Sequence, residues 1–228
     1  MTTMEIPVVY EDEHILAVDK PAGLAVHKVS PTDPQETLAD ILVAERPYLA
    51  GVGENPLRPG IVHRLDKETS GIMLIAKDQP TFEYLKDLFQ TRQMKKEYLA
   101  LVVGAPKEPS GTITATLGKM GTKQTTRLKG KRELVEREAV TDYRTEKTYR
   151  GYTLLRVMPR TGRTHQIRVH LQSIGCPIVG DRLYGKKGDH RPMFLHATRI
   201  SFTTPDGKAL TLEAGLPDSL QKVLDALE

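Results

Sequence analysis

The spacing of apolar residues along this chain predicts many short strands with a few helices between them. Alternating or short apolar runs bounded by charge, glycine or proline predict strands at residues 7–10, 15–19, 71–77, 95–104, 139–145, 152–158 and 193–202. Apolar positions at helical spacing predict helices at residues 37–45, 79–92, 165–174 and 219–227. Strands and helices do not alternate as regular βαβ units, and we find no internal repeat. This pattern favours an α+β fold around a large mixed or mostly antiparallel sheet flanked by helices and loops.

The segment 160–175 fits two patterns. Its apolar residues alternate as in a strand, but they also recur at the i, i+3, i+4, i+7 spacing of a helical face. We choose the helix because Thr164 is a suitable N-cap and Gly175 a suitable residue just beyond the C-terminus. Arg160 and Arg163 lie near the predicted helix start, where unpaired backbone N–H groups favour an anion.

Length and composition describe an ordinary globular protein. A chain of 228 residues can bury a substantial core, and we expect residues 1–228 to form a single domain. The one cysteine, Cys176, excludes an internal disulfide and a multi-cysteine zinc site. The N-terminus carries no secretory signal pattern, and no apolar run has the length of a membrane span. We therefore expect a soluble, cytoplasmic protein without membrane contact.

Charge is distributed unevenly along the chain. The net charge is +4, yet residues 119–199 hold 19 Lys and Arg against 7 Asp and Glu, so this segment carries +12 and the remainder −8. Such asymmetry indicates a basic face for a polyanion, although a solvated charged surface is the alternative. Residues 118–134 are rich in lysine and glycine and predict a mobile basic hairpin or loop. The basic residues expected there to contact phosphates are Lys119, Lys123, Arg127, Lys129 and Lys131.

The run 63–71, HRLDKETSG, places a single aspartate among basic and hydroxyl neighbours just before a predicted buried strand. Asp66 would lie in a loop at a strand edge, where a rigid scaffold can present a reactive group. The alternative is an aspartate that only closes a turn by hydrogen-bonding its own backbone.

Three histidines invite a metal hypothesis. His165 and His170 are five residues apart, which separates them widely around a helix and places them on opposite faces of a strand. Neither arrangement gives the chelate that i, i+4 spacing provides. We therefore expect these histidines and His63 to orient loops or contact backbone, and we expect no metal.

Together, these motifs resemble the RluA-type pseudouridine synthases, which isomerise uridine to pseudouridine in structured RNA. The resemblance covers nearly the whole chain. Its motifs lie, in the family's order, at residues 8–12, 20–23, 63–71, 96–100, 139–143, 160–170, 180–185 and 195–197. Many relatives carry an additional N-terminal S4 RNA-binding domain, which this sequence does not show, so the resemblance implies that the catalytic domain itself recognises the RNA.

The resemblance also implies roles for individual residues. Asp66 corresponds to the essential carboxylate, and Arg168 is the cation that the resemblance pairs with it. Tyr98 matches the active-site tyrosine that would stack on the uracil and take its C5 proton, although a tyrosine on a sheet face is the alternative. Arg64 matches the arginine that displaces the target base, with a phosphate-contacting surface arginine as the alternative. We also expect RNA contacts from His63, Arg160 and Arg163.

We therefore predict an RNA pseudouridine synthase with the pseudouridine synthase fold. It would act as a monomer on ribosomal or transfer RNA and need no cofactor. A catalytically silent RNA-binding or ribosome-assembly factor on the same fold is the first alternative. A metal-dependent hydrolase that uses His63, Asp66 and His165 is the second.

Overall fold

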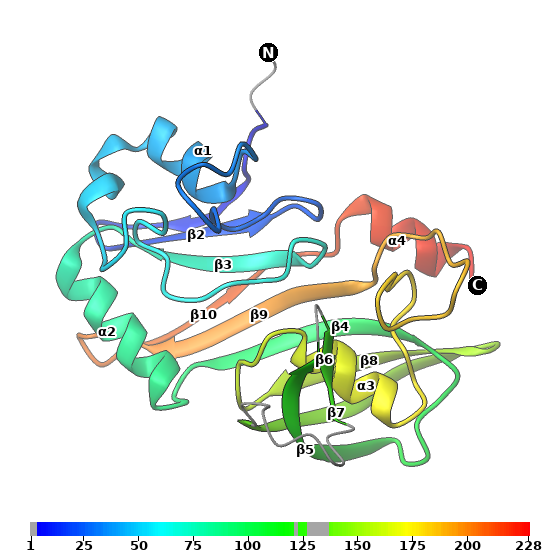
Figure 1. The fold of residues 1–228 in the computed structure, drawn as a ribbon. Helices are drawn as coiled ribbons and strands as arrows, with labels where there is room; N and C mark the ends of the chain where they lie inside the picture. Colours follow the sequence, from blue (N-terminus) through cyan, green and yellow to red (C-terminus); the bar gives the residue numbers. More distant parts are fainter. Residues whose placement is uncertain (1–3, 121–122, 127–136) are drawn as a thin grey trace. The chain divides into compact units, whose positions relative to one another are not determined.

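The computed structural model describes residues 4–120, 123–126 and 137–228, and it divides the chain into two compact units (Figure 1). The first unit comprises Met1–Lys95 and Ala197–Gly215, and the second comprises Lys96–His196 and Leu216–Glu228. The described residues contain ten strands and four α-helices. The strand pairings within each unit are antiparallel, so the predicted α+β class is confirmed.

In the first unit, β1 pairs with β2, β2 with β3, and β9 with β10. The strands are β1 (Val8–Glu11), β2 (Ile15–Lys20), β3 (Ser70–Ala76), β9 (Leu195–Thr203) and β10 (Ala209–Glu213). The helices are α1 (Leu38–Glu45), the 3-10 helix η1 (Pro47–Gly51) and α2 (Gln79–Gln90). Strand β9 begins in the second unit and continues into the first.

Both α-helices of the first unit begin at side-chain caps that the sequence encodes. Thr37 accepts a hydrogen bond from the backbone N–H of Asp40, whose carboxylate accepts one from the N–H of Thr37, which makes a capping box. Asp78 accepts from the backbone N–H of Thr81 and caps α2. These caps satisfy backbone donors that would otherwise lack partners, and they explain why both predicted helix starts are confirmed.

In the second unit the strand order is β4-β8-β7-β5-β6. These strands are β4 (Lys95–Val103), β5 (Ser110–Met120), β6 (Lys123–Thr125), β7 (Arg137–Tyr149) and β8 (Tyr152–Pro159). The helices are α3 (Gln166–Ser173) and α4 (Asp218–Asp225). β5 and β6 pair antiparallel, so the predicted basic hairpin is confirmed in its described part.

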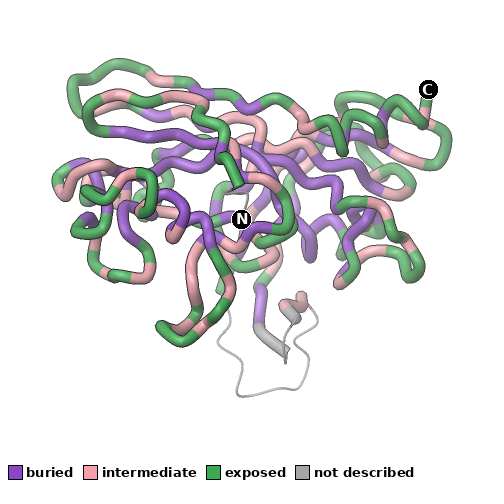
Figure 2. The backbone as a smooth tube through the Cα atoms, turned by 90° about the horizontal axis from the view of Figure 1, so that it is seen from above, coloured by how far each residue is buried: buried purple, intermediate pink, exposed green. Residues whose placement is uncertain are grey.

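The sheet of the second unit buries apolar side chains on both faces, as the period of two along β4 requires. Ala100 and Val102 belong to a cluster with Ile167 and Leu171 of α3. Leu101, from the opposite face of β4, belongs to a second cluster with residues of α4. Burial differs between strands: β2 and β3 are almost entirely buried, whereas β1 and β10 are mostly exposed or half-buried, and Figure 2 shows how buried and exposed stretches change along the chain.

Residues 166–173 form a helix as predicted, but the predicted N-cap is wrong. The residue before the helix is His165 rather than Thr164, and its backbone is left-handed, with φ of 54° and no capping side chain. The side-chain oxygen of Gln166 instead accepts the backbone N–H of Arg163 at 3.0 Å and the hydroxyl of Thr161 at 2.7 Å. A side chain from the first helical residue therefore organises the entry loop, and no threonine cap is needed.

Candidate active site

Asp66 lies in a tight turn of the first unit, directly before β3. The backbone N–H of Thr69 donates to the carbonyl of Asp66 at 3.1 Å. Every residue of β3 is buried. Gly71 opens the strand with φ of 116°, and a Cβ atom there would lie 2.3 Å from the carbonyl oxygen of Ala197, so only glycine fits. The turn therefore leads into a rigid, fully packed strand, as the sequence predicted for this run.

The buried side chain of Lys20 holds the backbone around the same turn. Its Nζ donates to three backbone carbonyls, those of Pro21 at 2.8 Å, Leu24 at 2.9 Å and Lys67 at 3.1 Å. The side chain is fully buried. Burial lowers the pKa of Lys20 to about 8, although the nearby carboxylates, including Asp66, favour its charged form. A buried ammonium thus joins the end of β2 to the residue that follows Asp66.

His63 and Arg64 flank this turn with different surroundings. The backbone N–H of Leu74 donates to Nε2 of His63 at 3.0 Å, and the imidazole stacks on Phe89 with ring centres 4.5 Å apart. His63 therefore contacts backbone, as expected, and holds the loop against β3 and α2. Arg64 is exposed, with Nη1 3.5 Å from Nε2 of His27. RNA contacts by His63 and Arg64 stay predictions.

Tyr98 lies on β4, in the second unit. It is half-buried and packs against the cluster that includes Ile167 and Leu171 of α3. Lys96 is two residues earlier and so projects from the same face of the strand. Burial lowers the pKa of Lys96 to about 8. Lys96 was not among the predicted site residues, and its only signal in the sequence is a charged residue on the inward side of a predicted strand.

Arg168, on the first turn of α3, is held by a buried ion pair. Its Nε donates to Oδ2 of Asp181 at 2.7 Å and its Nη2 to Oδ1 at 2.8 Å. The side chains of Arg168 and Asp181 are 8% and 0% exposed, so both charges are removed from water. Burial alone would raise the pKa of the Asp181 carboxyl, but the guanidinium and the N–H groups of Tyr184 and Leu183 hold that pKa below its usual value.

The three predicted catalytic residues belong to different units. Asp66 is in the first unit, whereas Tyr98 and Arg168 are in the second. The second unit carries Tyr98 on β4 and Arg168 on α3, which packs on the same face of that strand. The predicted pairing of Asp66 with Arg168 stays a prediction, and so does the single domain expected over residues 1–228.

The residues predicted to contact phosphates are distributed as follows. Arg160 is exposed and donates to both carboxylate oxygens of Asp142, at 2.6 and 2.9 Å. Arg163 is half-buried, with Nε 3.5 Å from the carbonyl of Glu138. Lys119 lies on β5 and Lys123 on β6. The predictions for Arg127, Lys129 and Lys131 lie outside the described residues.

A buried polar network anchors α3 to β7. Oγ1 of Thr141 lies 2.9 Å from Nε2 of Gln166 and 2.9 Å from Nδ1 of His170. His170 is fully buried, and its Nε2 has no hydrogen-bond partner among the described residues. Burial lowers the pKa of His170 to about 4, so the imidazole is neutral at pH 7. His170 thus joins α3 to a side chain of β7, whereas the sequence predicted a histidine that orients a loop or contacts backbone.

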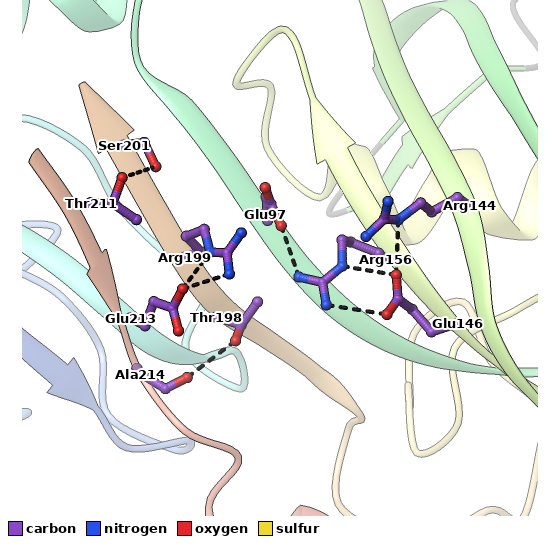
Figure 3. Close-up of polar contacts among 10 residues, drawn as sticks. All are labelled: Glu97, Arg144, Glu146, Arg156, Thr198, Arg199, Ser201, Thr211, Glu213 and Ala214. Carbon is purple, nitrogen blue, oxygen red and sulfur yellow. Dashed lines mark hydrogen bonds and ion pairs between the residues drawn. The ribbon is translucent and has the colours of Figure 1, made fainter. Parts of the chain in front are cut away.

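Other arginines of the basic segment are engaged by carboxylates of their own unit. Arg156 on β8 donates to Glu97 at 2.8 Å and to Glu146 at 2.9 Å (Figure 3). In the first unit, Arg199 donates to Glu213 at 2.7 Å and so joins β9 to β10 (Figure 3). These local ion pairs neutralise part of the positive charge of residues 119–199, from which the sequence predicted a basic face for a polyanion.

Neither a metal-binding group of side chains nor a membrane-spanning helix is found in the described residues. Within residues 4–120, 123–126 and 137–228, no group of three or more His, Cys, Asp or Glu is arranged to hold a metal ion. Across the same described stretches, no helix is long and apolar enough to cross a membrane. His165, one of the three ligands that a metal hydrolase would need, has Nδ1 3.0 Å from the hydroxyl of Tyr184.

Residues 14–173 match a protein-family model described as RNA pseudouridylate synthase. An uncharacterized RNA pseudouridine synthase of Chloroflexus aurantiacus is 45% identical over 214 residues, which are 92% of this chain and 66% of the relative. The ribosomal large subunit pseudouridine synthase D of Xanthomonas campestris is 39% identical over 236 residues, which cover 96% of this chain and 69% of the relative. The chain thus spans about two thirds of the length of these relatives.

A solved structure has the same fold. The human RNA pseudouridylate synthase domain containing 4 aligns with a TM-score of 0.78 and 27% identity, and the alignment covers 97% of this chain and 92% of the human one. The predicted pseudouridine synthase fold is therefore confirmed, and so is the resemblance drawn from the motifs. The chain belongs to the RluA-type RNA pseudouridine synthase family, whose enzymes are intramolecular isomerases.

Proposed function

We propose that this chain isomerises uridine to pseudouridine in structured RNA and that Asp66 is its essential carboxylate. One observation carries the proposal: Asp66 lies on a turn that is fixed through its backbone by the buried Lys20 and followed by the fully buried β3. Such a turn presents a carboxylate in one geometry, which suits a group that must meet a reacting carbon.

The reaction requires a group of this kind. The N1–C1′ bond of uridine breaks, uracil turns, and a C5–C1′ bond forms; C5 then loses its proton and N1 gains one, so the product is an isomer. Positive charge develops at the sugar carbon and negative charge on the detached base. A carboxylate can attack or stabilise the electron-poor centre, as carboxylates do in glycoside chemistry.

Tyr98 and Arg168 would complete the site. The tyrosine would stack on uracil and take the C5 proton, because its ring offers an apolar face and its hydroxyl a polar tip. The guanidinium would keep Asp66 ionised when substrate excludes water. In this proposal Arg64 displaces the target base, since uridine stacked in RNA hides the atoms that react.

Ribosomal RNA of the large subunit is the substrate we propose. Several relatives that match nearly the whole chain carry the name ribosomal large subunit pseudouridine synthase D. The basic residues of the second unit, with Arg160, Arg163, Lys119 and Lys123 among them, would contact the RNA backbone. The proposal places the enzyme in the cytoplasm as a monomer.

The test is a map of pseudouridines in total RNA from cells with and without the gene. We expect one or a few sites in large-subunit ribosomal RNA to disappear with the gene and to return with the wild-type protein but not with Asp66→Asn. Sites that disappear from transfer RNA instead would overturn the substrate. No lost site, together with retained RNA binding, would favour the silent RNA-binding factor.

A further inference from the structure

Asp181 is the residue whose contacts extend the proposed site furthest. Its carboxylate faces the Nε–Nη2 edge of Arg168, with both oxygens engaged at 2.7 and 2.8 Å. A guanidinium is planar, so two parallel hydrogen bonds fix the rotation of its plane as well as its position. Nη1 of Arg168 takes no part in these two hydrogen bonds. Because the guanidinium is planar, fixing its Nε–Nη2 edge also fixes the direction in which Nη1 points.

The carboxylate is itself fixed by the turn that carries it. Oδ1 of Asp181 accepts the backbone N–H groups of Leu183 at 2.9 Å and Tyr184 at 3.0 Å, and the carbonyl of Asp181 accepts the N–H of Gly185 at 2.8 Å. A Cβ atom on Gly185 would lie 2.3 Å from that carbonyl oxygen, so the turn needs glycine. Asp181 therefore has one available orientation.

The same turn also covers the guanidinium and contacts the start of its helix. The ring centre of Tyr184 lies 5.1 Å from Cζ of Arg168, close enough for a cation–π contact. The hydroxyl of Tyr184 lies 3.0 Å from Nδ1 of His165, the left-handed residue that precedes α3. The turn of residues 180–185 thus holds both the arginine side chain and the backbone from which it projects.

We propose that Asp181 is a positioning residue for the isomerisation: it holds the guanidinium of Arg168 in one orientation for the reaction and does not itself touch RNA. This inference rests on the proposed function, in which Arg168 is the cation of the site. A buried ion pair can also serve only to stabilise a fold, so the experiment must separate orientation from stability.

The principal variant is Asp181→Asn. Asparagine keeps an oxygen for the N–H groups of Leu183 and Tyr184, but it turns an NH₂ group toward the Nε–H of Arg168, where two donors oppose each other. The matched control is Asp189→Asn. Asp189 accepts from Nε and Nη2 of Arg191 at 2.9 and 2.8 Å, so the control removes a pair of the same geometry that does not include Arg168.

The assay is release of tritium from a large-subunit ribosomal RNA transcript labelled at uracil C5, with kcat and KM measured below the melting temperature of each variant. We expect Asp181→Asn to lower kcat about 10- to 100-fold with KM within about threefold, and Asp189→Asn to stay within about threefold in both. Asp181→Glu restores the charge on a longer side chain. We expect kcat to stay low in Asp181→Glu as well, with KM within about threefold, because the longer side chain cannot reproduce the paired geometry.

A double-mutant cycle tests whether Asp181 acts through Arg168. In an Arg168→Lys background, Asp181→Asn should change kcat less than about twofold, because the bidentate pair is already lost. Wild-type kcat in Asp181→Asn or Asp181→Glu, or full additivity in the cycle, would overturn the positioning role while the proposed function stands. An inactive wild-type protein would remove both.

Discussion

The Asp66 turn and the Arg168 guanidinium are held in opposite ways. In the first unit a buried cation, Lys20, binds carbonyls around the turn and fixes the backbone. In the second unit a buried anion, Asp181, binds the guanidinium and fixes the side chain. The reacting group on a short side chain needs only its backbone held, whereas a long flexible arginine needs its end held.

This difference separates stability from turnover. Loss of Lys20 should loosen the loops around the Asp66 turn and lower the free energy of unfolding. Loss of the Arg168 geometry should leave much of the fold intact and lower the rate.

Replacing Arg168 should have the largest effect of these substitutions. We expect Arg168→Lys to lower kcat about 100-fold, because a lysine ammonium is a point charge that cannot make the bidentate pair with Asp181. Tritium release from C5-labelled RNA measures the effect. Arg191→Lys is the matched control and should remain within about threefold of wild type. Equal losses in both variants would show that Arg168 has no special place in the reaction.

Replacing Lys20 should affect stability most. We expect Lys20→Met to lower the free energy of unfolding by about 3 kcal/mol, since it leaves the buried carbonyl of Leu24 and the part-buried carbonyl of Pro21 without this charged donor. Urea unfolding measures the change. The control, Lys67→Met, replaces an exposed lysine in the same turn and should stay within about 0.5 kcal/mol of wild type. A Lys20→Met protein as stable as the control would refute the support role.

His170, a neutral buried side chain, joins α3 to β7 and should make the free energy of unfolding depend on pH. Its pKa is about 4 in the folded protein against an ordinary value of 6.5, so the unfolded chain binds the extra proton first as pH falls. We expect this group to remove about 2 kcal/mol of stability between pH 8 and pH 5, with little further loss below pH 4. His170→Asn should flatten that part of the pH profile in denaturant unfolding. An unchanged profile would mean that another group titrates there.

The exposed pair of Arg160 with Asp142 should matter least for the fold. We expect Arg160→Ala to leave the free energy of unfolding nearly unchanged, because an ion pair exposed to water stabilises a fold little. Its effect should appear in RNA binding, as a several-fold weaker affinity and a salt-dependence slope reduced by about 1. Filter binding at several salt concentrations measures both. A salt slope equal to wild type would remove Arg160 from the RNA interface.

The sequence predicted most elements because their signals are local. Thr37 and Asp78 cap the helices that follow them, and the apolar run 71–77 can only be a covered strand. Strand β10 and the first part of β5 were missed, although apolar and polar residues alternate in both, with Ile113, Ala115 and Leu117 in β5 and Leu210 and Leu212 in β10. The N-cap of α3 was wrong because the helix begins one residue later than predicted, after the left-handed residue His165, which has no capping side chain.

For the site, the family motifs identified candidate groups but not their supports. Lys20 and Asp181 were visible only as members of motifs, because a buried charge is recognised by its three-dimensional neighbours and not by spacing. The two-unit division was also absent from the sequence pattern: no linker composition marks Lys95, and the chain crosses between units within β4 and β9.

The most direct test of the account is the single-turnover rate of Asp66→Asn, measured as tritium release and as pseudouridine formed in the same RNA. The control is Glu68→Gln, an exposed carboxylate two residues away in the same turn. We predict that Asp66→Asn binds RNA with near wild-type affinity and forms no detectable pseudouridine, whereas Glu68→Gln turns over within about threefold of wild type. Pseudouridine formed by Asp66→Asn at the wild-type rate would contradict the central claim.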